Sequence, residues 1–304
     1  MHVFWNPDEQ RLRTLWRLFA QAAIMVGLAA VPILVIAEPL TALHRRGFFL
    51  QAYNNDAYDR VVNMIVGPVM TVGVIGSVVI ARKWLDHRRV EELGVRLDRA
   101  WWRGLAGGLV LGTSLMTLVF VLEFVLGWIT LTGVMVSNAT GISVAFALSF
   151  SAVKVLCVGT YEEFVSRGYH LRNLADGIAL PWAVAVSSAI SALLHLTNDN
   201  AGMLSTAGLF VNALLFATAV LVTRRLSTAI GLHIAWNFVQ GAVFGFPVSG
   251  DKEGASLVGI HQGGATLLTG GAFGPEAGLV GILASLTGIG VLLLWAQWRK
   301  TGVS

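Results

Sequence analysis

Three clusters of ionisable and amide side chains lie within segments of the sequence that are otherwise apolar. Ionisable groups are costly inside such segments, so each cluster is a candidate functional site. Their residue types suit general acid–base chemistry and the stabilisation of an oxyanion. In chain order the clusters are Glu162, Glu163 and Arg167; His195; and His233 with Asn237.

The first cluster places two carboxylates beside one basic residue. Residues four apart share a helix face, so Arg167 can pair with Glu163. Glu162 lies about 100° further round the helix, at 3.6 residues per turn, and points elsewhere. A carboxylate left free in a dry pocket can serve as a general base. The alternative is an interfacial charge cluster at a helix end.

The histidines also have a functional and a structural interpretation. His233 and Asn237 are four apart, so they project together and could donate hydrogen bonds to a developing oxyanion. His195, from another helix, could orient water or bind a metal. The alternative for each is a hydrogen bond between helices. Glu123 is expected to make a helix-packing or cavity contact, and His261 to be exposed.

The composition indicates that a membrane surrounds these clusters. Of the 304 residues, 55% are hydrophobic and 12% are charged, with a mean hydropathy of +0.71. Soluble domains carry about 25% charged residues. The single cysteine, Cys157, excludes a disulfide framework and a cysteine-rich metal site. The net charge of +4 is attributed to loops of a membrane protein, and no nucleic-acid partner is expected.

A spanning helix needs about 20 apolar residues, and this pattern predicts an all-α, polytopic membrane helical bundle with about eight transmembrane helices and an intramembrane active-site cavity. Residues 1–304 are expected to form a single membrane-embedded domain, with its motif-bearing core at about 142–246. The segment 250–278 is either a floppy external loop or an irregular stretch packed within the protein. The predicted spans are 19–37, 61–81, 105–131, 142–160, 180–196, 203–222, 227–246 and 278–298.

The basic residues predict the orientation. Sixteen of the 21 Lys and Arg residues fall on the same side of these spans. The other side has Arg45, Arg46, Arg60 and Lys252, and Lys154 lies within a span. Cytoplasmic loops carry the excess of Lys and Arg, so both termini are expected in the cytoplasm, at a bacterial plasma membrane.

Taken together and in this order, the clusters resemble the CPBP family, also called Abi, which includes the type II CAAX prenyl endopeptidases. The family pattern is Glu-Glu-x-x-x-Arg, then Phe-x-x-x-His, then His-x-x-x-Asn or Asp, on three membrane helices. The resemblance covers about residues 150–250, and it extends more loosely to 244–250 and 270–276. Ser191 stands where the family has Phe, so the packing beside His195 is smaller and more polar.

The resemblance implies an intramembrane endopeptidase that acts through a glutamate-activated water. Its expected partners are membrane lipid and a peptide or membrane-protein substrate, with or without an attached lipid. The implied roles are a base, Glu162, assisted by Glu163 and positioned by Arg167; a residue that shares the water, His195; and an oxyanion site, His233 with Asn237.

No metal cofactor is expected, because the chain has no His-Glu-x-x-His motif. A zinc ion held by Glu162, His195 and His233 is the alternative. Glu162 and His195 can meet only if the helix that carries Glu162 continues to about Arg172, and if the next helix begins below the bilayer or tilts.

Two other classes of function remain open. The first is a non-catalytic membrane scaffold or bacteriocin-immunity-type protein that keeps the motifs as a structural polar network. The second is a transporter with Glu123, Lys154 and Glu162 along a polar path, although no inverted repeat is visible.

Overall fold

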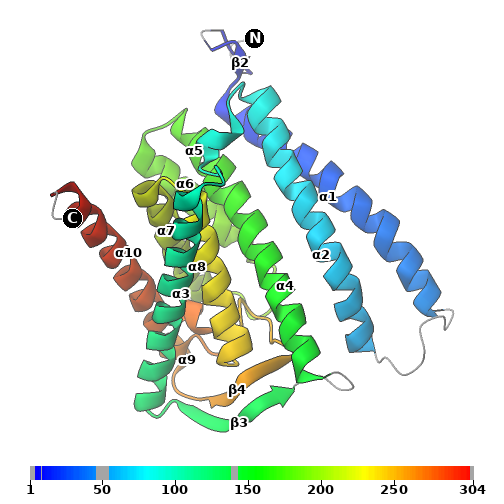
Figure 1. Cartoon of the computed structure of the whole chain (residues 1–304), viewed down its shortest axis with the longest axis vertical. Helices are drawn as coiled ribbons and strands as arrows, with labels where there is room; N and C mark the ends of the chain where they lie inside the picture. The colour runs from blue at the N-terminus through cyan, green and yellow to red at the C-terminus, as the bar shows by residue number, and fades with distance from the viewer. Residues whose placement is uncertain (1–3, 8, 46–54, 138–142, 302–304) are drawn as a thin grey trace.

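The computed structural model describes residues 4–7, 9–45, 55–137 and 143–301, which form a helical bundle with two small two-stranded sheets (Figure 1). Among the described residues, six helical segments are long and apolar enough to cross a membrane. The predicted polytopic helical bundle is therefore confirmed. The helices that carry these segments are α1 (Thr14–Arg45), α2 (Asn55–Ile80), α3 (Arg99–Val125), α4 (Val144–Glu163), α7 (Met203–Thr223) and α10 (Leu279–Lys300).

Shorter elements connect the long helices or extend them. They are β1 (Trp5–Asn6), β2 (Arg11–Leu12), η1 (Ala81–Leu85), η2 (Val90–Leu93), β3 (Ile129–Ser137), η3 (Phe164–His170), α5 (Leu171–Ala175), α6 (Leu180–Leu193), α8 (Leu226–Phe238), η4 (Val239–Val243), β4 (Ala255–Gln262), α9 (Thr266–Thr269) and η5 (Pro275–Ala277).

Two of the eight predicted spans are shorter helices than a bilayer requires. The span predicted at 180–196 is α6, with 14 residues, and the span predicted at 227–246 is α8, with 13. Helix α8 continues into the π-turn η4. A helix that crosses the hydrocarbon layer alone needs about 20 residues. The number of eight spans therefore stays a prediction.

The span predicted at 105–131 is too long, because its last residues are in a strand. Helix α3 ends at Val125, and Gly127 follows with φ at +74°, a left-handed conformation that commonly ends helices. The next residues include Ile129, Thr130 and Thr132, whose β-branched side chains favour a strand. They form β3, which pairs antiparallel with β4 at the lower end of the bundle (Figure 1).

The glycine-rich segment 250–278 contains β4, α9 and η5, and several of its side chains are buried. Ala255, Phe273 and Glu276 are each less than 5% exposed. Residues 253–256 and 273–278 are packed within the protein, whereas residues 263–267 are exposed, so each of the two predictions describes part of the segment.

Helices α3 and α8 are in backbone contact through glycines. A Cβ at Gly108 would meet the carbonyl of Thr228 on α8, and a Cβ at Gly231 would meet the carbonyl of Leu105 on α3. Gly112 lies one turn beyond Gly108 and makes the same kind of contact. Small residues at such spacing let membrane helices approach closely. Helix α8 is thereby held at a fixed height beside α3.

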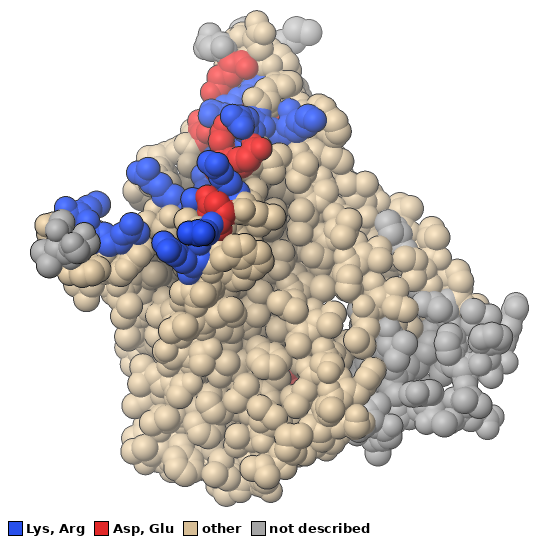
Figure 2. Space-filling view, in the orientation of Figure 1, with Lys and Arg blue, Asp and Glu red and all other residues tan. Residues whose placement is uncertain are grey.

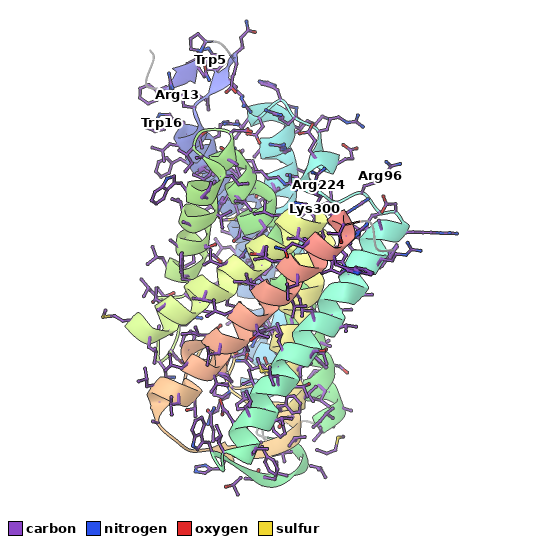
Figure 3. The ribbon with its side chains drawn as sticks, turned by 90° about the vertical axis from the view of Figure 1, so that its left-hand side faces the viewer. Trp5, Arg13, Trp16, Arg96, Arg224 and Lys300 are labelled. Atoms are coloured by element: carbon purple, nitrogen blue, oxygen red, sulfur yellow. The ribbon has the colours of Figure 1, made fainter. Side chains whose placement is uncertain are left out.

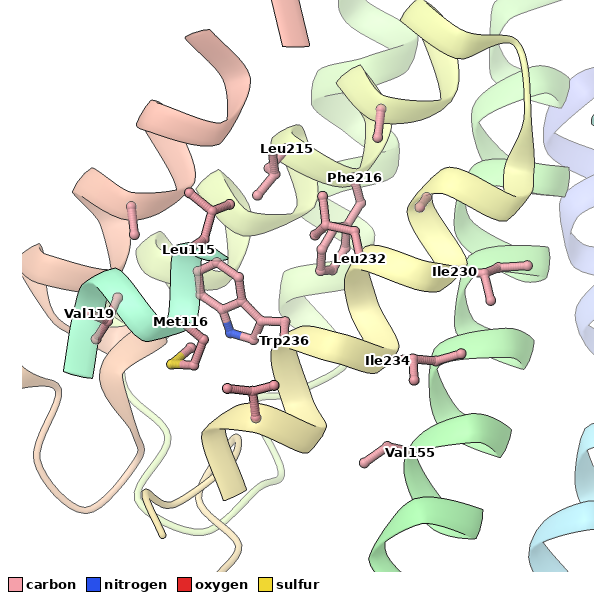
Figure 4. Packing of buried hydrophobic residues seen from close by; sticks show 14 of the residues in the cluster. Leu115, Met116, Val119, Val155, Leu215, Phe216, Ile230, Leu232, Ile234 and Trp236 are labelled. Atoms are coloured by element: carbon pink, nitrogen blue, oxygen red, sulfur yellow. The ribbon is translucent and has the colours of Figure 1, made fainter. Parts of the chain in front are cut away.

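A cluster of buried apolar side chains fixes the rotation of α8. Trp236 is 2% exposed and points from α8 toward Met116 and Leu115 of α3 (Figure 4). Leu215 and Phe216 of α7 belong to the same cluster. Trp236 lies three residues after His233 on α8, so the packing of its indole fixes the rotation of the helix that carries His233.

The Lys and Arg residues visible in Figure 2 gather at one end of the molecule. Arg96, Arg224 and Lys300 lie at this end, and Arg13 lies near it on the N-terminal part of the chain (Figure 3). We call it the basic end. Arg46, assigned to the opposite side, lies outside the described residues. That the basic end faces the cytoplasm stays a prediction.

A buried carboxylate ties α1 and α2 to the rest of the bundle at the basic end. Asp86 Oδ1 accepts hydrogen bonds from Arg17 Nη1 at 3.0 Å, Asn173 Nδ2 at 3.0 Å and Tyr169 Oη at 3.3 Å. Its Oδ2 accepts from Arg82 Nη1 at 3.1 Å. Both oxygens of this carboxylate are therefore hydrogen-bonded.

Candidate active site

The helix that carries the two glutamates continues far beyond them, as their meeting with His195 requires. Helix α4 ends at Glu163, widens into the π-turn η3 and continues as α5 to Ala175. Glu162 therefore lies in the interior of the apolar segment Val144–Ala175. π-turns within helices are rare and frequently occur at functional sites.

Glu163 is the buried centre of the polar network. Its side chain is 0% exposed, and Oε1 accepts hydrogen bonds from Arg167 Nη1 at 3.1 Å and His233 Nδ1 at 2.9 Å. Arg167 Nη2 also donates to the carbonyl of Ala213 at 3.1 Å. The predicted pairing of Arg167 with Glu163, and not with Glu162, is confirmed. Glu163 Oε2 is buried and has no hydrogen-bond partner in the described part of the chain.

His233 lies between the two glutamates. Its Nδ1 contacts Glu163, and its Nε2 is 4.0 Å from Glu162 Oε2. When Nδ1–H donates to Glu163, Nε2 is an acceptor in the neutral ring and a donor in the imidazolium. The ring stacks on Phe216 with centroids 4.8 Å apart, and the guanidinium carbon of Arg167 is 5.2 Å from the Phe216 centroid. Phe216 therefore buttresses both His233 and Arg167.

His195 and Asn237 reach the same region from two other segments. His195 follows the end of α6, and its Nδ1 is 2.9 Å from the carbonyl of Ser191, to which Nδ1–H can donate. That hydrogen bond leaves Nε2 available to the cavity. Ser191, which replaces the family's Phe, also lies near the network, with Oγ 3.5 Å from Arg167 Nη1. Asn237 lies one turn after His233 on α8.

One cavity of about 370 Å³ brings the predicted residues together. Glu162, His195, His233, Asn237 and Arg167 all line it. Glu163 is not among the lining residues and lies behind His233 and Arg167. The arrangement places a free carboxylate, two imidazoles and an amide around one space, which is the set that water activation and oxyanion binding require. The catalytic roles of these residues stay predictions.

The cavity also has lining residues that sequence reasoning did not identify as part of the site. Lys154 Nζ pairs with Asp251 Oδ2 at 2.5 Å and with Glu253 Oε1 at 3.0 Å. These acids precede β4 and lie nearly a hundred residues after Lys154 in the chain. The position of Lys154 within an apolar span was a usable signal, but nothing in the sequence names its partners.

Glu276 is a further buried acid at the cavity. Its Oε1 accepts from Ser249 N at 2.5 Å and from Ser249 Oγ at 3.2 Å, and its Oε2 accepts from Gln240 Nε2. No ion pair to Glu276 occurs among the described residues, and burial raises the pKa of its carboxyl to about 7. The sequence feature that could have identified Glu276 is its position as an isolated acid after Gly274 and Pro275.

Two other expectations are settled by the structure. Glu123 makes a packing contact, since its Oε2 accepts from Gln262 Nε2 at 2.7 Å, and it does not line the cavity that contains Lys154 and Glu162. His261 is exposed, as expected.

The geometry does not fit the zinc alternative. Across the described ranges, no group of three or more His, Cys, Asp or Glu side chains is placed to hold a metal ion. Glu162, His195 and His233 line the cavity without forming such a group. We derive no chemical step through a metal.

The fold and the cavity define a polytopic membrane protein with an acid–histidine site inside its helical bundle. Residues 143–239, about a third of the chain, match the family described as type II CAAX prenyl endopeptidase Rce1-like. The resemblance to CAAX-protease-like proteins is thereby confirmed, and with the six apolar helices it indicates an integral membrane protein. No curated protein and no solved structure matches the chain.

Proposed function

We propose that this protein is an intramembrane endopeptidase that hydrolyses a peptide bond in or beside the membrane with water activated by Glu162. The observation that carries the proposal is that Glu162, His195, His233 and Asn237 line one cavity although they come from three separate segments. The similarity of residues 143–239 to a family of prenyl endopeptidases supports this type of reaction.

In the proposed reaction, Glu162 is the general base. Its carboxylate accepts a proton from a water that His195 Nε2 also holds, and the hydroxide oxygen bonds to the carbonyl carbon. The proton then passes from Glu162 to the leaving nitrogen as the C–N bond breaks. A positioned acid–base residue contributes typically about 10²–10⁴-fold to the rate.

The negative charge that develops on the carbonyl oxygen needs hydrogen-bond donors. The Asn237 amide donates without any change of protonation. With Nδ1–H donating to Glu163 at 2.9 Å, His233 Nε2 donates only in the imidazolium form. Glu163 is then a positioning residue, because it acts on substrate only through His233. Arg167 positions Glu163 and also lines the cavity.

The expected substrate is a peptide or a membrane protein, with or without an attached lipid. The cavity's polar lining suits the backbone of an extended peptide better than a lipid chain. We assign the basic end of the bundle to the cytoplasm of a bacterial plasma membrane, because membrane proteins carry their excess of Lys and Arg on that side.

The test uses purified protein in liposomes and a panel of quenched fluorescent peptides, with prenylated and unprenylated members. Glu162→Gln removes the base and keeps the shape of the side chain, so cleavage should fall by about 10²–10⁴-fold. Glu91→Gln is the matched control, because Glu91 is exposed and does not line the cavity. It should cleave as the wild type does.

Cleavage by Glu162→Gln at the wild-type rate would contradict the proposal. Peptide binding without cleavage by the wild type, across the panel, would favour the non-catalytic scaffold. A preference between the prenylated and unprenylated peptides would decide whether the substrate carries a lipid.

A further inference from the structure

The β3–β4 ribbon and the adjoining end of α3 carry a group of exposed apolar side chains, which we call the ribbon patch. The side chains of Val125 and Val134 are 76% and 79% exposed. A group of exposed apolar side chains marks a contact with a partner or a membrane when they lie close together. The members of the ribbon patch are Val125, Leu126, Leu131, Val134 and Met135.

The ribbon patch lacks the charges that a surface facing water normally has. Neither β3 nor β4 contains an Asp, Glu, Lys or Arg residue, and His261 is their only ionisable residue. In the view of Figure 2, the charged side chains gather at the opposite end of the molecule, over the basic end. The composition of the ribbon therefore fits a lipid environment better than an aqueous one.

The lengths of two helices place the ribbon at the level of a membrane surface. The stretch of α3 from Arg103 to Val125 measures about 33 Å at 1.5 Å per residue. The stretch of α10 from Arg299 back to Leu279 measures about 30 Å on the same scale. The hydrocarbon core of a bilayer is about 30 Å thick. With the basic residues at one surface, Val125 reaches the other, and β3 begins four residues later.

The backbone of the ribbon excludes a deeper position. Within the described residues its sheet has two strands, so each strand has one edge outside the ladder. Backbone groups without partners are not tolerated against lipid in the hydrocarbon core, but water and headgroups satisfy them at the surface. An apolar ribbon with an open edge is therefore stable in the headgroup layer, with its side chains directed toward the acyl chains.

We propose that the ribbon patch is a lipid-contact surface, and that the ribbon lies in the headgroup layer of the membrane face opposite the basic end. Leu131 and Val134, whose partners Ile260 and Val258 share one face of the ribbon, contact the upper acyl chains there. The patch continues the exposed apolar surface of α3, where Phe124 and Val121 are also exposed. This continuity favours lipid over a second copy of the chain as the occupant.

The contact has a consequence for the cavity. Just before β4, Glu253 pairs with Lys154, and the cavity wall runs through Ser249 and Asp251. The lipid surface that holds the ribbon therefore also sets the depth of this wall in the membrane. The proposal does not depend on peptide hydrolysis.

The test measures the depth of a fluorescent probe at one position of the patch. In a Cys157→Ala background, Val134→Cys is labelled with an environment-sensitive nitrobenzoxadiazole group and placed in phosphatidylcholine–phosphatidylglycerol vesicles. Lys252→Cys is the matched control, because Lys252 is exposed in the loop before β4. Leu131→Cys gives a second probe if the first variant folds poorly, because Leu131 is exposed on the same face of the ribbon as Val134.

The Val134 probe should be quenched more strongly by lipids with a nitroxide near the headgroup than by lipids with a nitroxide at the chain end. It should also react with aqueous dithionite several-fold more slowly than the Lys252 probe. Equal reaction with dithionite and no lipid quenching would place the ribbon in water and overturn the proposal. Slow reaction without lipid quenching, together with disulfide-linked dimers of Val134→Cys, would assign the patch to a second copy and overturn it as well.

Discussion

Two buried carboxylates in this molecule lie against arginine, but their surroundings differ. Asp86, at the basic end, accepts hydrogen bonds on both oxygens from four side chains. Glu163, beside the cavity, accepts from Arg167 and His233 on one oxygen, and its other oxygen has no partner among the described residues. Both side chains are at most 2% exposed.

This difference in hydrogen bonding indicates that Asp86 has a structural role, whereas Glu163 belongs to a site that can react. A buried carboxylate whose oxygens both accept hydrogen bonds is stable, and neither oxygen is free to bind another group. Glu163 is held on one side only, and its histidine partner also faces a second acid at the cavity. The two sites therefore differ at the carboxylates themselves: both oxygens of Asp86 accept hydrogen bonds, whereas one oxygen of Glu163 has no partner among the described residues.

The largest expected effect is that of Arg167→Ala. It leaves Glu163 buried without its cation, which should lower the free energy of unfolding by about 3–5 kcal/mol. Cleavage should be lost as well, because Glu163 and His233 lose their alignment. Thermal unfolding in detergent and peptide cleavage should be measured on the same preparation. A variant as stable as the wild type would contradict the structural role of this pair.

Asp86→Asn should destabilise the protein without changing the site. We expect a loss of about 3 kcal/mol, at the lower end of the range for a broken buried pair. The loss is limited because Arg82 also pairs with Glu92 at 2.9 Å and Arg17 with Asp176 at 3.5 Å. Turnover per folded molecule, measured below the unfolding temperature, should be unchanged. A fall in turnover equal to that of Arg167→Ala would remove the distinction between the two acids.

Asn237→Ala should act on turnover and leave the fold intact. Loss of one oxyanion donor typically lowers the rate by about 10²–10³-fold. Peptide binding should be close to that of the wild type, and Asn237→Asp should retain part of the activity if its carboxyl is protonated. Single-turnover cleavage and binding should be compared on the same preparations. Equal losses of peptide binding and of cleavage would indicate that Asn237 has a packing role.

Glu276 extends the comparison to a buried acid without a cation. Its pKa of about 7 in the folded protein exceeds the ordinary value of 4.5, so the folded state holds a proton that the unfolded state releases between these values. The stabilisation is complete below pH 4.5 and is lost as the pH rises to about 7. The loss is roughly 3–4 kcal/mol, at about 1.4 kcal/mol per pH unit.

The measurement for Glu276 is the unfolding temperature in detergent across this pH range. Glu276→Gln cannot titrate, so its curve should be flatter than that of the wild type. Parallel curves for the two proteins would show that Glu276 is ionised in the folded state throughout this pH range, so that folding does not raise its pKa.

Phe216→Leu should have the smallest effect. An aromatic contact is worth about 0.5–1.5 kcal/mol beyond area burial, so kcat should fall by roughly 2- to 10-fold. KM should change less than kcat, because Phe216 holds His233 and Arg167 in addition to lining the cavity. Phe216→Tyr keeps the ring and is the matched control. A change confined to KM would instead indicate direct contact with substrate.

Helical spacing explains how much of the site could be predicted. Residues four apart share a helix face whatever the tertiary structure, so the pairing of Arg167 with Glu163 followed from the sequence. The contact between Glu163 and His233 did not, because it joins residues 70 apart and depends on how α8 packs. The same limit applies to Lys154, whose partners lie on a loop that no local pattern connects to α4.

The fold was predictable to a similar extent. Apolar length identified the helical bundle, but it also extended a span into 129–131, because Ile129 and Leu131 are as apolar as the residues of α3. Hydropathy does not distinguish a lipid-facing helix from an apolar ribbon. The glycine at position 127 and the β-branched residues after it were the available signals.

The close contact of α3 and α8 at their glycines limits how far His233 can shift from its position at the cavity. Gly231 lies two residues before His233, and its missing side chain lets the α8 backbone touch that of α3. A methyl group there would act as a wedge that displaces the imidazole without touching the cavity. Displacement of a reacting group by about 1 Å can lower a rate by 10²-fold. The absence of a side chain at Gly231 thus helps to fix the position of His233 between Glu162 and Glu163.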